Sequence, residues 1–177
     1  MDQFLTTYFL ESGIGLAVAG AMLCVMFGGW GSSRGLRISG AQAAGVLSEK
    51  PELFGKVLVL TALPGTQGFY ALITAIMIAQ KTKLIDGAPV CPPIIGFGLF
   101  FVGLCAGVVQ YRSAIFQGEA SAASINLTSR KPEESGRSIL FPALIETYAV
   151  LALLTSILVT NWLTSEKVVS MFQKAAK

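Results

Sequence analysis

Four apolar runs, each about as long as a bilayer is thick, dominate this 177-residue sequence. A helix needs roughly 20 apolar residues to cross the hydrocarbon core. The runs that meet this length are Leu5 to Trp30, Val57 to Ala79, Ile94 to Gln110 and Ile139 to Trp162. Only 13% of the residues are charged, whereas a soluble domain carries about a quarter. The sequence therefore predicts an all-α membrane protein with four transmembrane helices.

The two halves of the chain are related in sequence. Ser48 to Ile78 aligns without gaps to Ser129 to Val159, an offset of 81 residues, and twelve of the 31 pairs are identical. Because each unit holds two spans, the repeat predicts two tandem hairpins with one topology, related by an axis along the membrane normal. A ring of hairpins is the natural closed assembly of such units. We expect a first hairpin at 1–80, an outer loop at 81–93, a second hairpin at 94–163 and a tail at 164–177.

The distribution of lysine and arginine predicts the orientation. Eight flank the two hairpin turns, namely Arg34, Arg37, Lys50, Lys56, Arg112, Arg130, Lys131 and Arg137. Five lie on the opposite side, namely Lys81, Lys83, Lys167, Lys174 and Lys177. By the positive-inside rule the hairpin turns face the cytoplasm and both termini face outward.

The composition disfavours most soluble functions. The chain has no histidine and a net charge of only +3, which argues against a His-based metal site and against nucleic-acid binding. The three cysteines, Cys24, Cys91 and Cys105, lack metal-site spacing and are interpreted as small apolar packing residues.

Glycines concentrate in the first helix of each hairpin, where Gly31/Gly35 and Gly103/Gly107 form GxxxG pairs. Small residues let helix backbones approach closely in lipid. We expect the first and third helices to form a tightly packed inner layer, with the second and fourth helices outside.

Glu146 lies eight residues into the fourth apolar run. An ionisable side chain at this depth is costly and by default marks an ion pathway. A protonated glutamic acid that only joins helices by hydrogen bonding is the structural alternative. In repeat register Gly65 stands where Glu146 stands, so we expect one acidic site for two hairpins.

Oxygen-bearing residues accompany this carboxylate. Leu63, Thr66, Gln67 and Tyr70 are spaced i, i+3, i+4 and i+7, which places them on one face of a helix. Pro64 disturbs the preceding turn and frees backbone carbonyls there. With Gln110 and Glu146, these groups can present oxygen to a hard cation.

These motifs resemble the duplicated proteolipid, called K or c, of vacuolar and archaeal-type rotary ATPases. The resemblance rests on LPGTQGFY from Leu63, Gln110 in AGVVQYRSA, KPE in both hairpin turns and ALIETYA around Glu146. It covers nearly the whole chain, from Ser12 to about Trp162, and departs in the 81–93 loop and the tail.

The resemblance implies a rotor-ring subunit that carries Na⁺ and has no nucleotide site of its own. The implied ligands are the Leu63 carbonyl, Thr66, Gln67, Gln110 and Glu146, with Tyr70 hydrogen-bonding the carboxylate. The implied partners are copies of the chain in a ring, a stator subunit with an essential arginine, central-stalk subunits at the cytoplasmic turns, and lipid.

Three alternatives remain open at this stage. The same rotor could carry H⁺, with the amides only hydrogen-bonding a protonated Glu146. The chain could instead be a small channel or transporter with Glu146 as its gate, or a structural membrane scaffold. The sequence leaves open the number of subunits in the ring, the pump or synthase direction and the organism.

Overall fold

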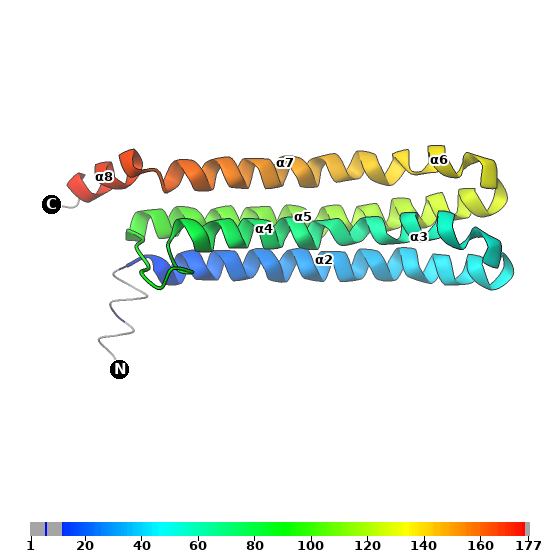
Figure 1. Cartoon of the computed structure of the whole chain (residues 1–177), viewed down its shortest axis with the longest axis horizontal. Coiled ribbons are helices and arrows are strands. Elements are labelled where there is room, and N and C mark those ends of the chain that lie inside the picture. The colour runs from blue at the N-terminus through cyan, green and yellow to red at the C-terminus, as the bar shows by residue number, and fades with distance from the viewer. Residues whose placement is uncertain (1–5, 7–11, 176–177) are drawn as a thin grey trace. The chain divides into compact units, whose positions relative to one another are not determined.

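We describe the chain from a computed structural model, which covers residue 6 and residues 12–175 (Figure 1). The predicted start of the first span at Leu5 lies outside the described residues. The described part of the chain is helical and contains no strand. In chain order the elements are α2 (Ile14–Glu49), η2 (Pro51–Leu53), α3 (Phe54–Ala62), η3 (Leu63–Gly65), α4 (Thr66–Lys81), α5 (Pro93–Arg130), η4 (Pro132–Glu134), α6 (Ser135–Ser138), α7 (Leu140–Leu163) and α8 (Glu166–Ala175).

Within this part, four helical stretches are long and apolar enough to cross a membrane, as predicted. They are Ile14–Glu49, Pro51–Lys81, Pro93–Arg130 and Pro132–Leu163. The first and third continue about 20 residues beyond their predicted ends at Trp30 and Gln110. Small and polar helix-compatible residues follow each apolar run without a proline, so the backbone has no reason to leave the helix.

A Lys-Pro pair ends each of these long helices. Lys50 has φ −134° and ψ 68°, and Lys131 has φ −136° and ψ 81°. The ring of the following proline clashes with a helical residue before it, which forces both lysines out of the helix. A short 3₁₀ turn then starts the returning helix in each half, so the repeated KPE motif encodes both hairpin turns.

The contacts divide the chain into two compact units, and each unit takes segments from all four spans. The first unit comprises residues 1–26, 71–108 and 152–177, and the second comprises 27–70 and 109–151. The units therefore differ from the two hairpins of the repeat.

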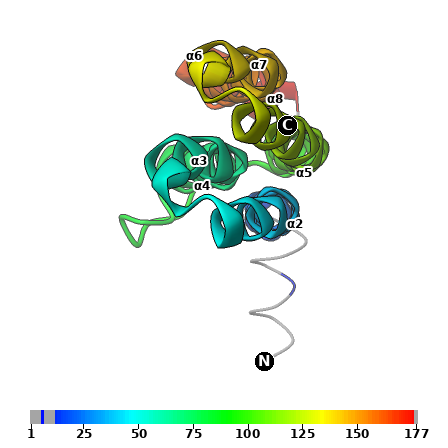
Figure 2. The same cartoon turned by 90° about the vertical axis from the view of Figure 1, so that its right-hand side faces the viewer.

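In the second unit, α5 lies between α2 and α7 (Figure 2). A Cβ atom on Gly118 of α5 would lie 2.6 Å from the Gly35 Cα of α2, so only glycine permits this approach. A buried core cluster fills the unit near the hairpin turns; its members are Ala43, Val46, Leu53, Val57, Leu60 and Ile125. The close pairing of the first and third helices agrees with the glycine pattern.

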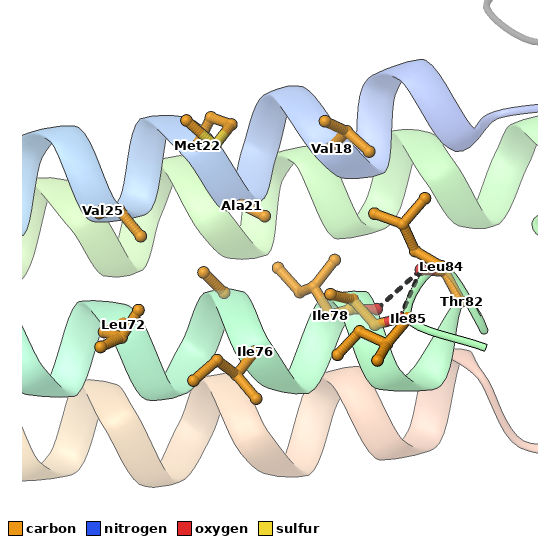
Figure 3. Close-up of a pocket in the computed structure, with 12 residues that line it drawn as sticks. Val18, Ala21, Met22, Val25, Leu72, Ile76, Ile78, Thr82, Leu84 and Ile85 are labelled. Atoms are coloured by element: carbon orange, nitrogen blue, oxygen red, sulfur yellow. Dashed lines mark hydrogen bonds between the residues drawn. The ribbon is translucent and has the colours of Figure 1, made fainter. Parts of the chain in front are cut away.

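The first unit has its own apolar core around Ile14, Ala17, Ile78 and Leu99. Beside it is an apolar pocket of about 360 Å³, bounded by α2, α4 and the segment after α4 (Figure 3). Thr82 is the one polar residue among those that line it, and its hydroxyl donates to the Ile78 carbonyl at 2.9 Å. The pocket thus offers surface for apolar groups and no group for chemistry.

Candidate functional site

The predicted site residues lie in the second unit, where Pro64 interrupts the second span. The 3₁₀ turn Leu63–Gly65 separates α3 from α4 at this proline. The Leu63 carbonyl accepts the backbone N–H of Thr66, and the Thr66 hydroxyl donates to it at 3.0 Å. The Leu63 and Thr66 oxygens are therefore neighbours at the break in the helix. In the second half the helix is interrupted earlier, at Ile139, and residues 144–146, which match Leu63–Gly65 in the repeat, are α-helical.

Glu146 is half-buried on α7, and Tyr70 of α4 reaches it across the unit. The Tyr70 hydroxyl donates a hydrogen bond of 2.7 Å to Glu146 Oε1. The two residues are 76 positions apart in sequence, so this bond joins the two halves of the repeat. This is the usual length of a well-formed O–H···O hydrogen bond.

Gln67 and Gln110 are both fully buried, and each has its amide nitrogen engaged. Gln67 Nε2 donates to Gln117 Oε1 at 2.6 Å, and Gln110 Nε2 donates to the Ala149 carbonyl at 2.9 Å. Among the described residues, neither the Gln67 nor the Gln110 amide oxygen has a hydrogen-bond partner. A buried polar atom without a partner is costly and calls for an explanation such as a bound ion.

Sequence reasoning missed Gln117, a fully buried residue of α5. Its amide nitrogen donates to the Pro142 carbonyl at 3.0 Å and lies 3.5 Å from Glu146 Oε2. A signal was present in the spacing, because buried polar residues recur along α5 at helical intervals. They are Gln110, Ser113, Gln117, Ser121, Ser124 and Thr128. Polar groups at this spacing form one face of a helix, and in a membrane such a face must meet other polar groups.

The first half of the repeat lacks this arrangement. Gly65 stands at the position of Glu146 and Leu36 at the position of Gln117, in both cases 81 residues earlier. A Cβ atom on Gly65 would lie 3.7 Å from Leu36 Cδ1, so positions 36 and 65 face each other as positions 117 and 146 do. At the repeat-equivalent positions 65 and 146 there is thus one carboxylate, where an exact duplication would give two.

Hydrogen bonds join Tyr70, Gln67, Gln117 and Glu146 into one cluster, whereas Gln110 bonds to the Ala149 carbonyl, one turn beyond Glu146 on α7. The cluster carries carboxylate, amide and hydroxyl oxygens. Oxygen ligands of this kind suit hard cations, and a single carboxylate balances a single positive charge. Within the part of the chain that the structure describes, no three His, Cys, Asp or Glu residues cluster as a transition-metal site. The fold and site define a membrane protein of duplicated helical hairpins in which Tyr70 and a buried glutamine meet the carboxylate of Glu146.

Comparison with known sequences gives the family. The ATP synthase C-subunit family matches residues 19–78 and again residues 100–159, which together make up more than half of the chain. The chain belongs to this family. The two matches are 81 residues apart, which confirms the repeat and the resemblance that the motifs indicated.

Three relatives are similar over most of the chain. The V-type sodium ATPase subunit K of Enterococcus hirae is 33% identical over 89% of this chain and 96% of its own length. The A-type ATP synthase subunit K of Methanocaldococcus jannaschii is 37% identical over 81% of this chain and 60% of its own length. The 16 kDa proteolipid of the V-type proton ATPase of Nephrops norvegicus is 26% identical over 79% of this chain and 86% of its own.

Proposed function

We propose that this chain is a rotor-ring subunit of a V/A-type ATPase and carries Na⁺ on Glu146. The observation that carries the proposal is the pair of buried amide oxygens, on Gln67 and Gln110, that have no partner among the described residues. Both amides are held by their nitrogens, so their oxygens are the atoms left to bind a cation. The similarity to a subunit K of a V-type sodium ATPase supports the same cargo.

In the proposed mechanism the carboxylate of Glu146, the two amide oxygens, the Thr66 hydroxyl and the Leu63 carbonyl surround the ion. An unpaired carboxylate is unfavourable in hydrocarbon, so a site facing lipid must be occupied. The Tyr70 hydroxyl holds Glu146 Oε1 and keeps the carboxylate in position. This chain binds and releases the ion, and nucleotide chemistry belongs to other subunits.

The proposal includes the assembly and its partners. Copies of the chain form the ring, with the hairpins at 1–80 and 94–163 as its repeating units. A stator subunit supplies an arginine that attracts the emptied carboxylate at the ring surface and promotes ion release. The basic hairpin turns face the cytoplasm and contact the central stalk, and both termini face outward, in a prokaryotic cell membrane.

Labelling of Glu146 by a hydrophobic carbodiimide tests the cargo. We expect Na⁺ at fixed pH to slow the labelling of the assembled ring, because the bound ion occupies the carboxylate. K⁺ at the same ionic strength is the control and should protect much less. Equal labelling with and without Na⁺ would favour the H⁺ rotor in place of the Na⁺ rotor.

A stand-alone channel is the second candidate, and reconstitution distinguishes it. The purified ring in vesicles should carry no Na⁺ current without its ATPase partners. A sustained current from the ring alone, lost in Glu146→Gln, would identify a channel.

A further inference from the structure

We propose that neighbouring copies of this chain join through the exposed faces of α2 and α5, with Phe116 of one copy seated against Ser33 and Arg37 of the next. Glu119 of the first copy pairs with that same Arg37. The inference rests on the proposed function, because it concerns copies assembled in a ring. It adds the residues that form the contact between copies, and all of them lie in the second unit.

The contact between α2 and α5 within one chain is the template. A Cβ atom on Gly31 would lie 2.5 Å from the Tyr111 Cα, and one on Gly118 would lie 2.6 Å from the Gly35 Cα. Glycine is therefore required where the two helices meet in the chain. Because this side of each helix is filled, a contact with another copy must use other sides.

The repeat predicts which positions form that second contact. In a ring of tandem hairpins, the second hairpin of one copy meets the first hairpin of the next as the two hairpins meet within a chain. Each position of α2 is then exchanged for the position of α5 that lies 81 residues later. Phe116 stands at the position of Gly35, and Arg37 stands at the position of Gly118. We therefore expect Phe116 to face Arg37 of the next copy.

A hollow on α2 lies where the repeat places this phenylalanine. Its volume is about 430 Å³, and its lining consists of Trp30, Ser33, Arg34 and Arg37. Ser33 stands at the position of Ala114, whose carbonyl a Cβ on Gly35 would contact. The repeat therefore places Phe116 over Ser33 as well as Arg37. The Phe116 side chain is 47% exposed on the single chain, so it is available to fill a hollow on a neighbour, as a knob fills a hole between packed helices.

The charges on the two faces are complementary. Arg112 lies over the Phe116 ring at 5.4 Å, so a second cation at this ring needs an anion nearby. Glu119 supplies one, because it follows Phe116 by three positions and is exposed on the same face of α5. Within the described part of the chain the one ion pair lies elsewhere, so Arg37 and Glu119 are both left for a partner on another copy.

The contact between copies is wider than the contact within a chain. Arg112 and Phe116 stand where Gly31 and Gly35 stand in the first half. The distance between packed helices follows the size of the side chains between them. The first and third helices therefore alternate between a close glycine pair inside each chain and a wider pair between chains.

Cross-linking between two kinds of subunit tests the contact. Rings are assembled from a mixture of Arg37→Cys chains and Glu119→Cys chains, both carrying Cys105→Ser because Cys105 is exposed. We expect a short bis-maleimide to join chains into dimers in the mixed ring and to give none with either variant alone. A dimer joins two different chains, so a contact within one chain cannot produce it.

Gln42→Cys and Asn126→Cys form the matched control pair. They lie on the same two helices, and their side chains are hydrogen-bonded at 2.6 Å within one chain. Placed on separate chains of a mixed ring, this pair should give no dimer. Equal dimer yields from the control pair and the test pair would overturn the proposed contact. Should Arg37→Cys or Glu119→Cys not assemble, Ser33→Cys with Phe116→Cys gives the same comparison.

Charge reversal tests the pairing of Arg37 with Glu119. The measured quantity is the temperature at which half of the ring dissociates into single chains in detergent. We expect Arg37→Glu and Glu119→Arg each to lower this temperature and the double variant to recover most of the loss, since it restores the pair with its charges exchanged. Losses that add in the double variant would overturn the pairing, because residues that only stabilise their own helices have no reason to rescue each other.

The remaining outcomes separate this inference from the proposed function. Absence of dimers from both test pairs, in a ring that Na⁺ still protects from carbodiimide, would overturn the inference and leave the proposed function standing. A chain that stays single in the membrane would overturn both. Dimers from the test pair in a ring without Na⁺ protection would support the inference and overturn the Na⁺ cargo alone.

Discussion

The hydroxyl of Tyr70 donates to Glu146 Oε1 at 2.7 Å, across 76 positions of sequence and between α4 and α7. The bond therefore joins a residue of the first half of the repeat to the carboxylate of the second half. In repeat register the second half has Leu151 where the first has Tyr70, and the first half has Gly65 where the second has Glu146. The site therefore depends on both hairpins.

Replacing Tyr70 by phenylalanine should weaken Na⁺ binding. The variant loses a hydrogen bond to the carboxylate, worth about 1.5–3 kcal/mol when the partner is charged. We expect the Na⁺ concentration for half-protection of Glu146 to rise about tenfold or more. Tyr148→Phe is the control, because Tyr148 is 68% exposed and should leave the value unchanged. An unaffected Tyr70→Phe ring would show that the hydroxyl is dispensable.

Replacing Gln110 by leucine should have an equal or larger effect. The change removes a buried amide oxygen that has no partner among the described residues, and also the bond that Gln110 Nε2 donates to the Ala149 carbonyl. We expect Na⁺ to protect Glu146 only at concentrations more than about tenfold above the wild type. Gln42→Leu is suited as a control, because Gln42 is a half-buried glutamine of α2 whose amide nitrogen donates to Asn126 Oδ1. A wild-type response of Gln110→Leu would contradict its place among the ligands.

Replacing Gly35 by alanine should destabilise the protein. An added Cβ would lie 2.7 Å from the Pro64 Cβ and would also contact the Ala114 carbonyl, so backbones of packed helices would have to move. Overpacking of this kind costs about 1–3 kcal/mol or more. Gly40→Ala lies on the same helix with open space around it and should be neutral or stabilising. The measurement is the midpoint temperature of thermal unfolding in detergent, compared between the two variants and the wild type. A Gly35→Ala midpoint at or above the wild-type value would refute the packing argument.

Cys91 should resist alkylation in the folded protein. Burial raises the pKa of the Cys91 thiol to about 11, because the thiolate loses water. The thiol form is therefore retained at neutral pH, and the reactive thiolate becomes abundant only as the pH rises toward 11. We expect maleimide at about pH 7 to leave Cys91 unmodified until the protein is denatured, as read by mass spectrometry of its peptide. Rapid modification in the native state would contradict the burial.

The spans, the repeat and the turns could be predicted from sequence because each depends on local chemistry. Apolar length defines a span, and proline after Lys50 and Lys131 defines where a helix stops. The predicted ends of the first and third helices lie too early in the chain. Apolar residues indicate the part of a helix that crosses the membrane, and a helix can continue beyond that part. Beyond Trp30 and Gln110 the chain becomes polar and stays helical.

The contacts within the site were predictable only in part. The tyrosine, the amides and the carboxylate could be recognised as candidate site residues from their type alone, because polar side chains are uncommon in apolar runs. Gln117 was missed because its role depends on which face of α5 meets α4 and α7, and that follows from long-range packing. The chain divides into two units that do not coincide with the two hairpins of the repeat, and this division also follows from long-range packing.

Equilibrium binding of radioactive Na⁺ to the purified ring tests the central claim most directly. We predict one Na⁺ bound per chain, because Gly65 replaces the second carboxylate, and none bound at the same concentration in Glu146→Gln. Binding that survives in Glu146→Gln, or a wild-type ring that binds no Na⁺, would contradict the assignment of Glu146 as the ion-carrying carboxylate.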